Sequence, residues 1–147
     1  MMALLIWLFG LRTLPPIHPI WIAGAIHAGI VLANAALPGR LRVRDNLKSL
    51  PVFVRQIFYV HWVYIVIVVG FFSALCFGFA RDLAGASPLG RFLSAFMCGF
   101  WLLRIFLQCL YYDRELRRAN RVLDSLYLVS LIALTGIFGS VSIHPVM

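Results

Sequence analysis

The sequence predicts an all-α integral membrane protein: an up-and-down bundle of four transmembrane helices with a short N-terminal apolar interfacial segment. Of the 147 residues, 63% are hydrophobic and only 12% are charged, and the mean hydropathy is +0.95. About 25% of the residues of a soluble domain are charged. Because so few charges cannot cover a water-facing surface, most of the exterior must face lipid or another apolar partner. The apolar residues also gather in four runs, which predicts a single transmembrane domain over residues 1–147.

Each of the four runs is long enough to cross about 30 Å of hydrocarbon at about 1.5 Å of helical rise per residue. The predicted spans are Ile17–Leu37, Ile57–Ala80, Phe92–Tyr112 and Ser125–Ile143. Arg104 is the only formally charged residue within them.

The connections between the spans are short. Pro38 and Gly39 predict the end of the first helix, and Ser49 and Pro51 suit the start of the second. The connection around Ala84–Pro88 is rich in Gly, Ser and Pro and predicts a tight loop. Short connections make neighbouring helices antiparallel, which favours an up-and-down bundle.

The segment Met1–Leu11 is apolar, but its 11 residues are too few to cross a membrane. Pro15 and Pro16 prevent a helix from continuing into the first span. The segment has neither the basic start nor the small-residue cleavage site of a secretory signal peptide. We therefore expect it to lie at the membrane interface or against a partner.

Basic residues are distributed unequally between the two sides of the predicted bundle. Three lie on one side, namely Arg12, Arg81 and Arg91. Nine lie on the other: Arg40, Arg42, Arg44, Lys48, Arg55, Arg114, Arg117, Arg118 and Arg121. The positive-inside rule therefore predicts that both basic connections are cytoplasmic and both termini are outside. Because these residues bracket apolar runs, the pI of about 10.3 indicates membrane topology and does not indicate nucleic-acid binding.

Small residues recur four positions apart on three of the spans. They are Gly70, Ala74 and Gly78 on the second span, Ala95 and Gly99 on the third, and Gly136 and Ser140 on the fourth. Small residues at this spacing let helix backbones approach closely in lipid. The spacing predicts close packing, either within the bundle or against a different protein.

Arg104 is the most unusual residue of the predicted spans, because an arginine near a helix centre costs about 2.5 to 3.5 kcal/mol on insertion scales. It lies about 12 Å from the cytoplasmic boundary by helical rise. On the second span Tyr64 has a matching depth, and His61 matches the depth of Gln108. The sequence therefore predicts a polar cluster in the cytoplasmic half of the bundle. Its members are His61, Tyr64, Arg104 and Gln108, joined by Asn34, His27 and Tyr127.

This cluster has two interpretations. Its groups satisfy one another and fix the helix register, or they form a ligand pocket. In a pocket, Arg104 would hold an anion such as a lipid phosphate or carboxylate, or His61 and Tyr64 would contact a quinone. Haem b ligated by His27 and His61 is a further alternative, although their predicted depths differ by roughly 7 to 9 Å. The predicted spans hold no Asp or Glu, which argues against a carboxylate proton relay.

A second basic feature is a stripe of four arginines after the third span. Arg114, Arg117, Arg118 and Arg121 are spaced i, i+3, i+4 and i+7, which places them on one helical face. Such a stripe attracts anionic lipid headgroups at about 1 kcal/mol per basic residue. Docking of an acidic partner is the alternative.

Three segments carry a resemblance: Arg55-Gln-Ile-Phe-Tyr-Val-His61-Trp-Val-Tyr64, Phe100-Trp-Leu-Leu-Arg104 and Gln108-Cys-Leu-Tyr-Tyr-Asp113. Over about Leu50 to Ile143 the chain resembles a group of small bacterial four-helix inner-membrane proteins to which no activity is assigned. The resemblance implies a bacterial inner membrane. It also draws attention to His61, Arg104, Gln108 and Asp113, without supplying a mechanism.

The sequence contains no HExxH, zinc-type Cys/His spacing, GxSxG or P-loop motif. We therefore expect a non-enzymatic accessory or scaffolding subunit, without a metal or cofactor, that packs against membrane lipids and a larger membrane complex or further copies of itself. Bound phospholipid is compatible with this role. The alternative is a membrane redox protein that binds haem b or quinone near His27, His61 and Arg104.

Overall fold

The computed structural model describes residues 17–40, 45, 47–111 and 121–145. These residues form four long helices, α2 (Ile17–Arg40), α4 (Val52–Gly78), α6 (Pro88–Leu110) and α8 (Arg121–Ile143), and one short helix, α5 (Ala80–Ala84). No strand occurs among them. All four long helices are long and apolar enough to cross a membrane. The predicted all-α four-helix membrane bundle is confirmed, while the interfacial segment Met1–Leu11 lies outside the described residues.

Several helix ends differ from the predicted ends. The helices α4, α6 and α8 begin four or five residues before the predicted apolar runs, because their first turns include residues beyond the hydrocarbon. At the start of α6, for example, the Ser87 Oγ accepts a hydrogen bond from the Gly90 N–H at 3.1 Å, and Pro88 takes the first helical position. The predicted stop at Pro38 is wrong, since α2 continues to Arg40. A proline in the last turn removes only one backbone hydrogen bond.

The connection between α4 and α6, which we call the corner, contains the short helix α5. The α4 helix ends at Gly78, and the short helix α5 follows it. The sequence predicts only a tight loop after the second span and no helix there. The Ser94 Oγ of α6 donates a hydrogen bond to the Leu83 carbonyl oxygen of α5 at 3.0 Å. This bond ties α5 to the first turns of α6.

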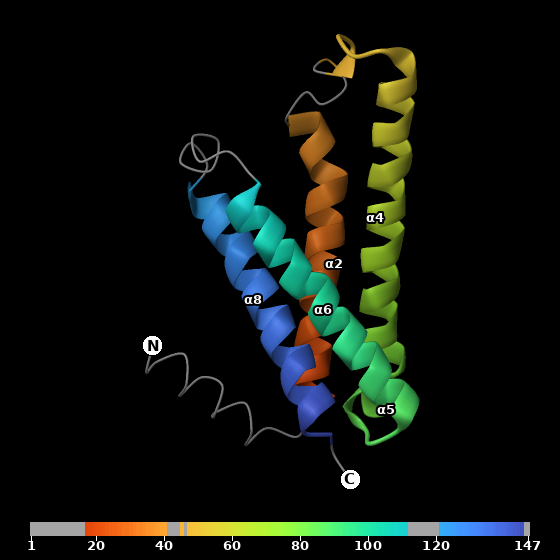
Figure 1. Cartoon of the computed structure of the whole chain (residues 1–147), viewed down its shortest axis with the longest axis vertical. Helices are drawn as coiled ribbons and strands as arrows, with labels where there is room; N and C mark the ends of the chain where they lie inside the picture. The colour runs from red at the N-terminus through yellow and green to blue at the C-terminus, as the bar shows by residue number, and fades with distance from the viewer. Residues whose placement is uncertain (1–16, 41–44, 46, 112–120, 146–147) are drawn as a thin grey trace.

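The helices form two antiparallel pairs, α2 with α4 and α6 with α8 (Figure 1). At one end of the bundle α2 and α6 end and α4 and α8 begin; we call this the basic end, because both basic connections leave from it. The other is the α5 end. The α6 helix starts beside α4 near the α5 end but finishes beside α8, well away from α4 (Figure 1). The two pairs therefore diverge toward the basic end.

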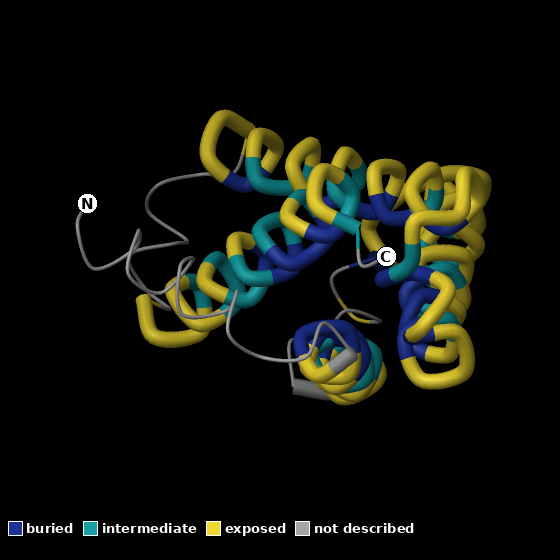
Figure 2. The backbone as a smooth tube through the Cα atoms, turned by 90° about the horizontal axis from the view of Figure 1, so that it is seen from below, coloured by how far each residue is buried: buried dark blue, intermediate teal, exposed yellow. Residues whose placement is uncertain are grey.

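The core lies between the pairs, in the middle of the bundle and near the α5 end. Buried residues face inward and exposed residues face outward on every helix (Figure 2). The largest buried side chains include Ile20 of α2, Met97 and Trp101 of α6, and Leu131 and Phe138 of α8. The outward residues are mostly large and apolar, as expected of side chains that face lipid.

The closest approach of α2 to α4 is at Gly24. A Cβ at Gly24 would lie 3.0 Å from the Cβ of Cys76 and 3.1 Å from the Phe77 ring. One turn away, the Ser73 Oγ donates to the Gly24 carbonyl oxygen at 2.9 Å. The absence of a side chain at Gly24 thus allows a tight contact between the two helices.

The small-residue stripes predicted on α4 and α6 do not make such close contacts. A Cβ at Gly78 or Gly99 would meet nothing within 4 Å, and at Gly70 it would meet only Val31, at 4.0 Å. Ala74 and Ala95 are exposed. The interpretation as packing within the bundle is therefore wrong for Ala74, Gly78, Ala95 and Gly99, because these positions are exposed, whereas Gly70 is half-buried and faces Val31 of α2. Contact with a different protein stays a prediction for them.

Candidate functional site

His27 is the polar centre of the core. Its Nδ1 lies 2.6 Å from the Ala23 carbonyl oxygen, and its Nε2 lies 3.0 Å from the Trp101 Nε1. An indole N–H can only donate, so Nε2 is the acceptor and Nδ1 carries the proton donated to Ala23. The geometry therefore selects the neutral Nδ1–H tautomer of a fully buried histidine.

Aromatic rings from three helices surround this imidazole. The ring centroids of Phe72 on α4, Trp101 on α6 and Phe138 on α8 lie 5.7, 5.3 and 5.9 Å from that of His27 on α2. The His27 side chain is thus the point where all four long helices meet. Its chemistry there is that of a structural hydrogen-bond bridge.

The predicted haem pair is not brought together, which corrects the alternative based on His27 and His61. Both ring nitrogens of His27 are already engaged. His27 lies level with Phe72, and His61 is eleven residues farther along α4, about 16 Å by helical rise. His61 is exposed. One iron cannot reach both imidazoles in this arrangement.

The basic half of α6 is joined to α8 by two polar contacts. The Arg104 Nε donates to the Tyr127 Oη at 3.3 Å, and the guanidinium carbon lies 5.6 Å from the centre of the Tyr127 ring. One turn farther on, the Gln108 Nε2 donates to the Asp124 Oδ1 at 2.6 Å. Gln108 is buried and the other three side chains are half-buried.

Two more contacts join α6 and α8 toward the α5 end. The Cys98 Sγ donates to the Thr135 carbonyl oxygen at 3.5 Å, and the Arg91 Nε donates to the Ser142 carbonyl oxygen at 3.3 Å. Arg91 thereby places a cation beside the C-terminus of α8, where the helix dipole favours positive charge. Polar contacts therefore secure this helix pair along its whole length.

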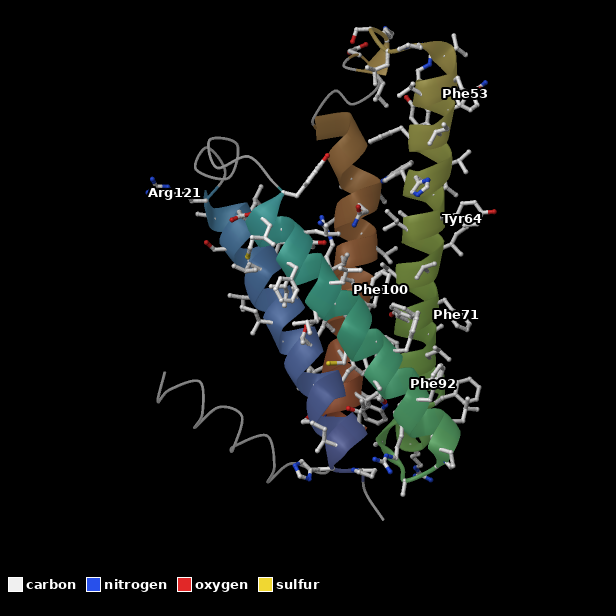
Figure 3. The ribbon with its side chains drawn as sticks, in the orientation of Figure 1. Phe53, Tyr64, Phe71, Phe92, Phe100 and Arg121 are labelled. Carbon is white, nitrogen blue, oxygen red and sulfur yellow. The ribbon has the colours of Figure 1, made fainter. Side chains whose placement is uncertain are left out.

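The structure does not bring His61 and Tyr64 to this cluster, contrary to the prediction. Both lie on α4, and Tyr64 is 64% exposed and points away from the other helices (Figure 3). The matched depths predicted for Arg104 and Tyr64 are compatible with the structure. Their helices, however, diverge at this level, so Arg104 meets Tyr127 of α8 instead.

Asn34 satisfies its amide within its own helix, because its Nδ2 donates to the Ile30 carbonyl oxygen at 2.8 Å. It is half-buried and lies one turn beyond the buried Ile30 on the same face of α2. No described contact joins it to Arg104 or Gln108.

The arginine stripe is described only at its last member. Arg121 begins α8 and is exposed, whereas Arg114, Arg117 and Arg118 lie outside the described residues, as does Asp113. The predicted docking of lipid headgroups or of a partner on this stripe stays a prediction.

Trp101 is the site residue that the sequence analysis missed. In the sequence it is one of many aromatic residues in an apolar run. The useful signal is its depth, since a tryptophan in mid-span, away from the interfaces that this residue prefers, needs a partner for its N–H. His27 is the histidine predicted at mid-membrane depth.

The described polar contacts are pairs of side chains that join neighbouring helices. Among the described residues, no group of three or more His, Cys, Asp or Glu side chains could hold a metal ion. Comparison of the chain with protein-family models, with curated proteins and with solved structures finds no match.

Replacing Gln108 with leucine should lower the free energy of unfolding by about 1 kcal/mol, the size measured for hydrogen bonds between membrane helices. The change removes the donor to Asp124 and keeps an apolar side chain of similar size. Unfolding of the reconstituted protein, followed by loss of helicity, measures the effect. Cys109→Leu changes the exposed neighbour and should be neutral. Equal stability of both variants would show that the bond does not stabilise the α6–α8 pair.

Proposed function

We propose that this protein is a small accessory or scaffolding subunit that packs against a larger membrane protein through the outer face of α4. The proposed location is the inner membrane of a bacterium. In this orientation the basic end lies in the cytoplasm and both termini lie outside. The supporting observation is that α4 exposes two polar side chains, His61 and Tyr64, at membrane depth.

His61 and Tyr64 lie nine and twelve residues after Val52, about 14 and 18 Å along the helix. Neither makes a hydrogen bond, ion pair or ring contact with any residue that the structure describes. A polar group left unpaired in hydrocarbon costs free energy, so polar residues at this depth usually face protein. A partner helix that supplies hydrogen-bonding groups removes this cost.

The rest of the outer face of α4 suits a helix partner. Phe53, Tyr64 and Phe71 project on the same side, away from the bundle (Figure 3). Ala74 and Gly78 are exposed toward the α5 end of the helix, where small residues allow a second backbone to approach closely. The face therefore combines aromatic contact area, two hydrogen-bonding groups and space for a helix.

Photo-crosslinking in the native membrane tests this proposal. A photoreactive amino acid in place of Tyr64 should yield a discrete adduct with a larger membrane protein. The matched control is the same amino acid in place of Val129, which is 62% exposed on α8 between the exposed Leu126 and Ile132. That position should yield lipid adducts only.

Three results would overturn the proposal. They are lipid adducts alone at both positions, an adduct of Tyr64 with only a second copy of the chain, and an identical protein adduct at both positions. Tyr64→Phe supplies a second readout, because it removes only the hydroxyl and should weaken co-purification of the partner in mild detergent. Recovery of an active monomer with reproducible turnover of a membrane substrate would instead favour an enzyme.

A further inference from the structure

The two helix pairs differ from each other in few contacts but are each joined internally. In the first pair, α2 packs closely against α4 at Gly24, where Ser73 donates its hydrogen bond. In the second pair, four polar contacts join α6 to α8 along their length. Among the hydrogen bonds between described residues of the four long helices, one runs from pair to pair, from the Trp101 Nε1 to the His27 Nε2. The pairs therefore depend on this bond and on apolar packing for their contact.

On α4, the two faces that meet in the core differ toward the basic end. The face of Ser73, which contacts α2, continues through half-buried residues, namely Val66, Trp62 and Tyr59. The face of Phe72, which contacts α6, continues through Ile65 and Phe58, which are 48% and 45% exposed. Spacings of three, four and seven residues keep each set on its own face. The α4 helix therefore stays packed against α2 after it has separated from α6.

The second pair shows the same limit of the shared core. The first buried residue of α8 is Leu131, so none of the residues from Arg121 to Ser130 is buried. On α6 the only buried residue beyond Trp101 is Gln108, and its hydrogen bond runs to α8. The core that joins the two pairs therefore ends near the level of Trp101 and its bond to His27.

The opposite end of the bundle is held together by the corner. The helix α5 contacts all four long helices, and its Ala80, Leu83 and Ala84 are buried in the core. The Ser94–Leu83 bond also ties α5 to α6. The pairs are thus connected at the α5 end and in the middle, whereas at the basic end α6 lies well away from α4 (Figure 1).

We infer that the two helix pairs rock against each other as rigid bodies about the corner and the His27–Trp101 contact, so that the separation of their basic ends varies. Collective domain motions of this kind take microseconds to milliseconds. The motion is a property of the bundle alone and does not depend on the proposed protein partner.

A small rotation is enough to produce a measurable change. Phe53 lies nineteen residues before Phe72, about 28 Å by helical rise. A rotation of about 10°, which is within the scatter of preferred helix crossing angles, therefore moves the basic end of α4 by about 5 Å. The same rotation leaves a hydrogen bond at the pivot within its usual angular range, so the His27–Trp101 bond persists during the motion.

Double electron–electron resonance between two nitroxide labels in the full chain, reconstituted in vesicles and frozen, tests this inference. Each label is carried by an encoded unnatural amino acid, because the free cysteines Cys76, Cys98 and Cys109 would react with a thiol label. Labels at Phe53 of α4 and Val122 of α8, which are 71% and 81% exposed, report on the basic ends of different pairs. We expect a broad distribution of distances between them.

Two further label pairs are the matched controls. Leu32 of α2 and Phe53 of α4 lie within the first pair, and Leu32 is 70% exposed. Trp21 of α2 and Phe92 of α6 lie in different pairs but toward the α5 end, and are 49% and 67% exposed. Both distributions should be narrow. A Phe53–Val122 distribution as narrow as that of Leu32–Phe53 would overturn the inference, as would a Trp21–Phe92 distribution as broad as that of Phe53–Val122.

A variant at the pivot supplies a second measurement. Trp101→Phe removes the hydrogen bond between the pairs and keeps most of the ring, so it should widen the Phe53–Val122 distribution and leave that of Leu32–Phe53 unchanged. Leu103→Ala, at a residue 59% exposed on the same helix, should change neither. Equal Phe53–Val122 distributions in Trp101→Phe and the unaltered chain would show that this contact is not the pivot and would overturn the inference. The three distributions of the unaltered chain keep the test decisive if Trp101→Phe does not fold.

Discussion

Replacing Trp101 with alanine should lower the free energy of unfolding by about 3 to 5 kcal/mol, the usual cost of removing a large buried aromatic side chain. The indole is 2% exposed and packs against the rings of His27 and Phe100, at centroid distances of 5.3 and 5.1 Å. The loss combines a cavity with an unsatisfied acceptor, because the His27 Nε2 loses its only described donor. Unfolding of the reconstituted protein measures the change.

A conservative variant separates these two contributions. Trp101→Phe keeps most of the ring and removes the N–H, so it should cost about 1 to 3 kcal/mol, the penalty of a buried acceptor without a donor. Leu103→Ala, two positions along the same helix and facing outward from the core, should change stability by no more than about 0.5 kcal/mol. If Trp101→Phe were as stable as the unaltered chain, the hydrogen bond to His27 would make no net contribution.

The fold was predictable because hydropathy and helix length act on each segment separately. Each of the four predicted spans overlaps one long helix, and Arg104 lies half-buried toward the basic end, as its position in the third span predicts. The short helix α5 was not predictable from the Gly-, Ser- and Pro-rich signal that follows it. It depends on contacts with the next helix, such as the Ser94–Leu83 bond.

The site was predictable only in part, because depth does not identify the neighbouring helix. The sequence pairs Arg104 with Tyr64 of α4 by depth and includes Tyr127 only as a further member of the cluster, yet Tyr127, six residues into α8, is the observed partner. The choice between them depends on the crossing of α6 over the bundle, which results from packing of all four helices. Periodicity within one helix carries no information on that crossing.

Small residues illustrate the same limit. Gly99 belongs to a regular four-residue stripe, yet it lies on an outward face, whereas the isolated Gly24 marks the tight contact of α2 with α4. A sequence motif shows where a backbone can be approached closely. Whether a second helix does approach at that position depends on how the neighbouring helices pack.

Gly90 occupies the tightest contact of the α5 end. A Cβ added there would overlap the backbone oxygen of Asp82 and lie 2.9 Å from the Ser87 Oγ. Both obstacles are fixed: the first is main chain of α5, and the second is the cap that accepts the Gly90 N–H. A methyl group therefore cannot be accommodated by rotation of a flexible side chain.

Gly90→Ala should for this reason cost about 3 kcal/mol, the upper part of the range for overpacking, in spite of the higher helix propensity of alanine. Gly99→Ala is the matched control, since a Cβ at Gly99, on the same helix, meets nothing within 4 Å. That variant should be neutral or slightly more stable. Thermal unfolding of both variants in the same vesicles measures the difference.

The clash acts on the junction of α5 with α6, so the Ser94–Leu83 hydrogen bond should break in the Gly90→Ala variant. Ser94→Ala should therefore destabilise the Gly90→Ala variant less than it destabilises the unaltered chain. Equal costs of Ser94→Ala in the two backgrounds would show that the corner accommodates the methyl group without separating α5 from α6.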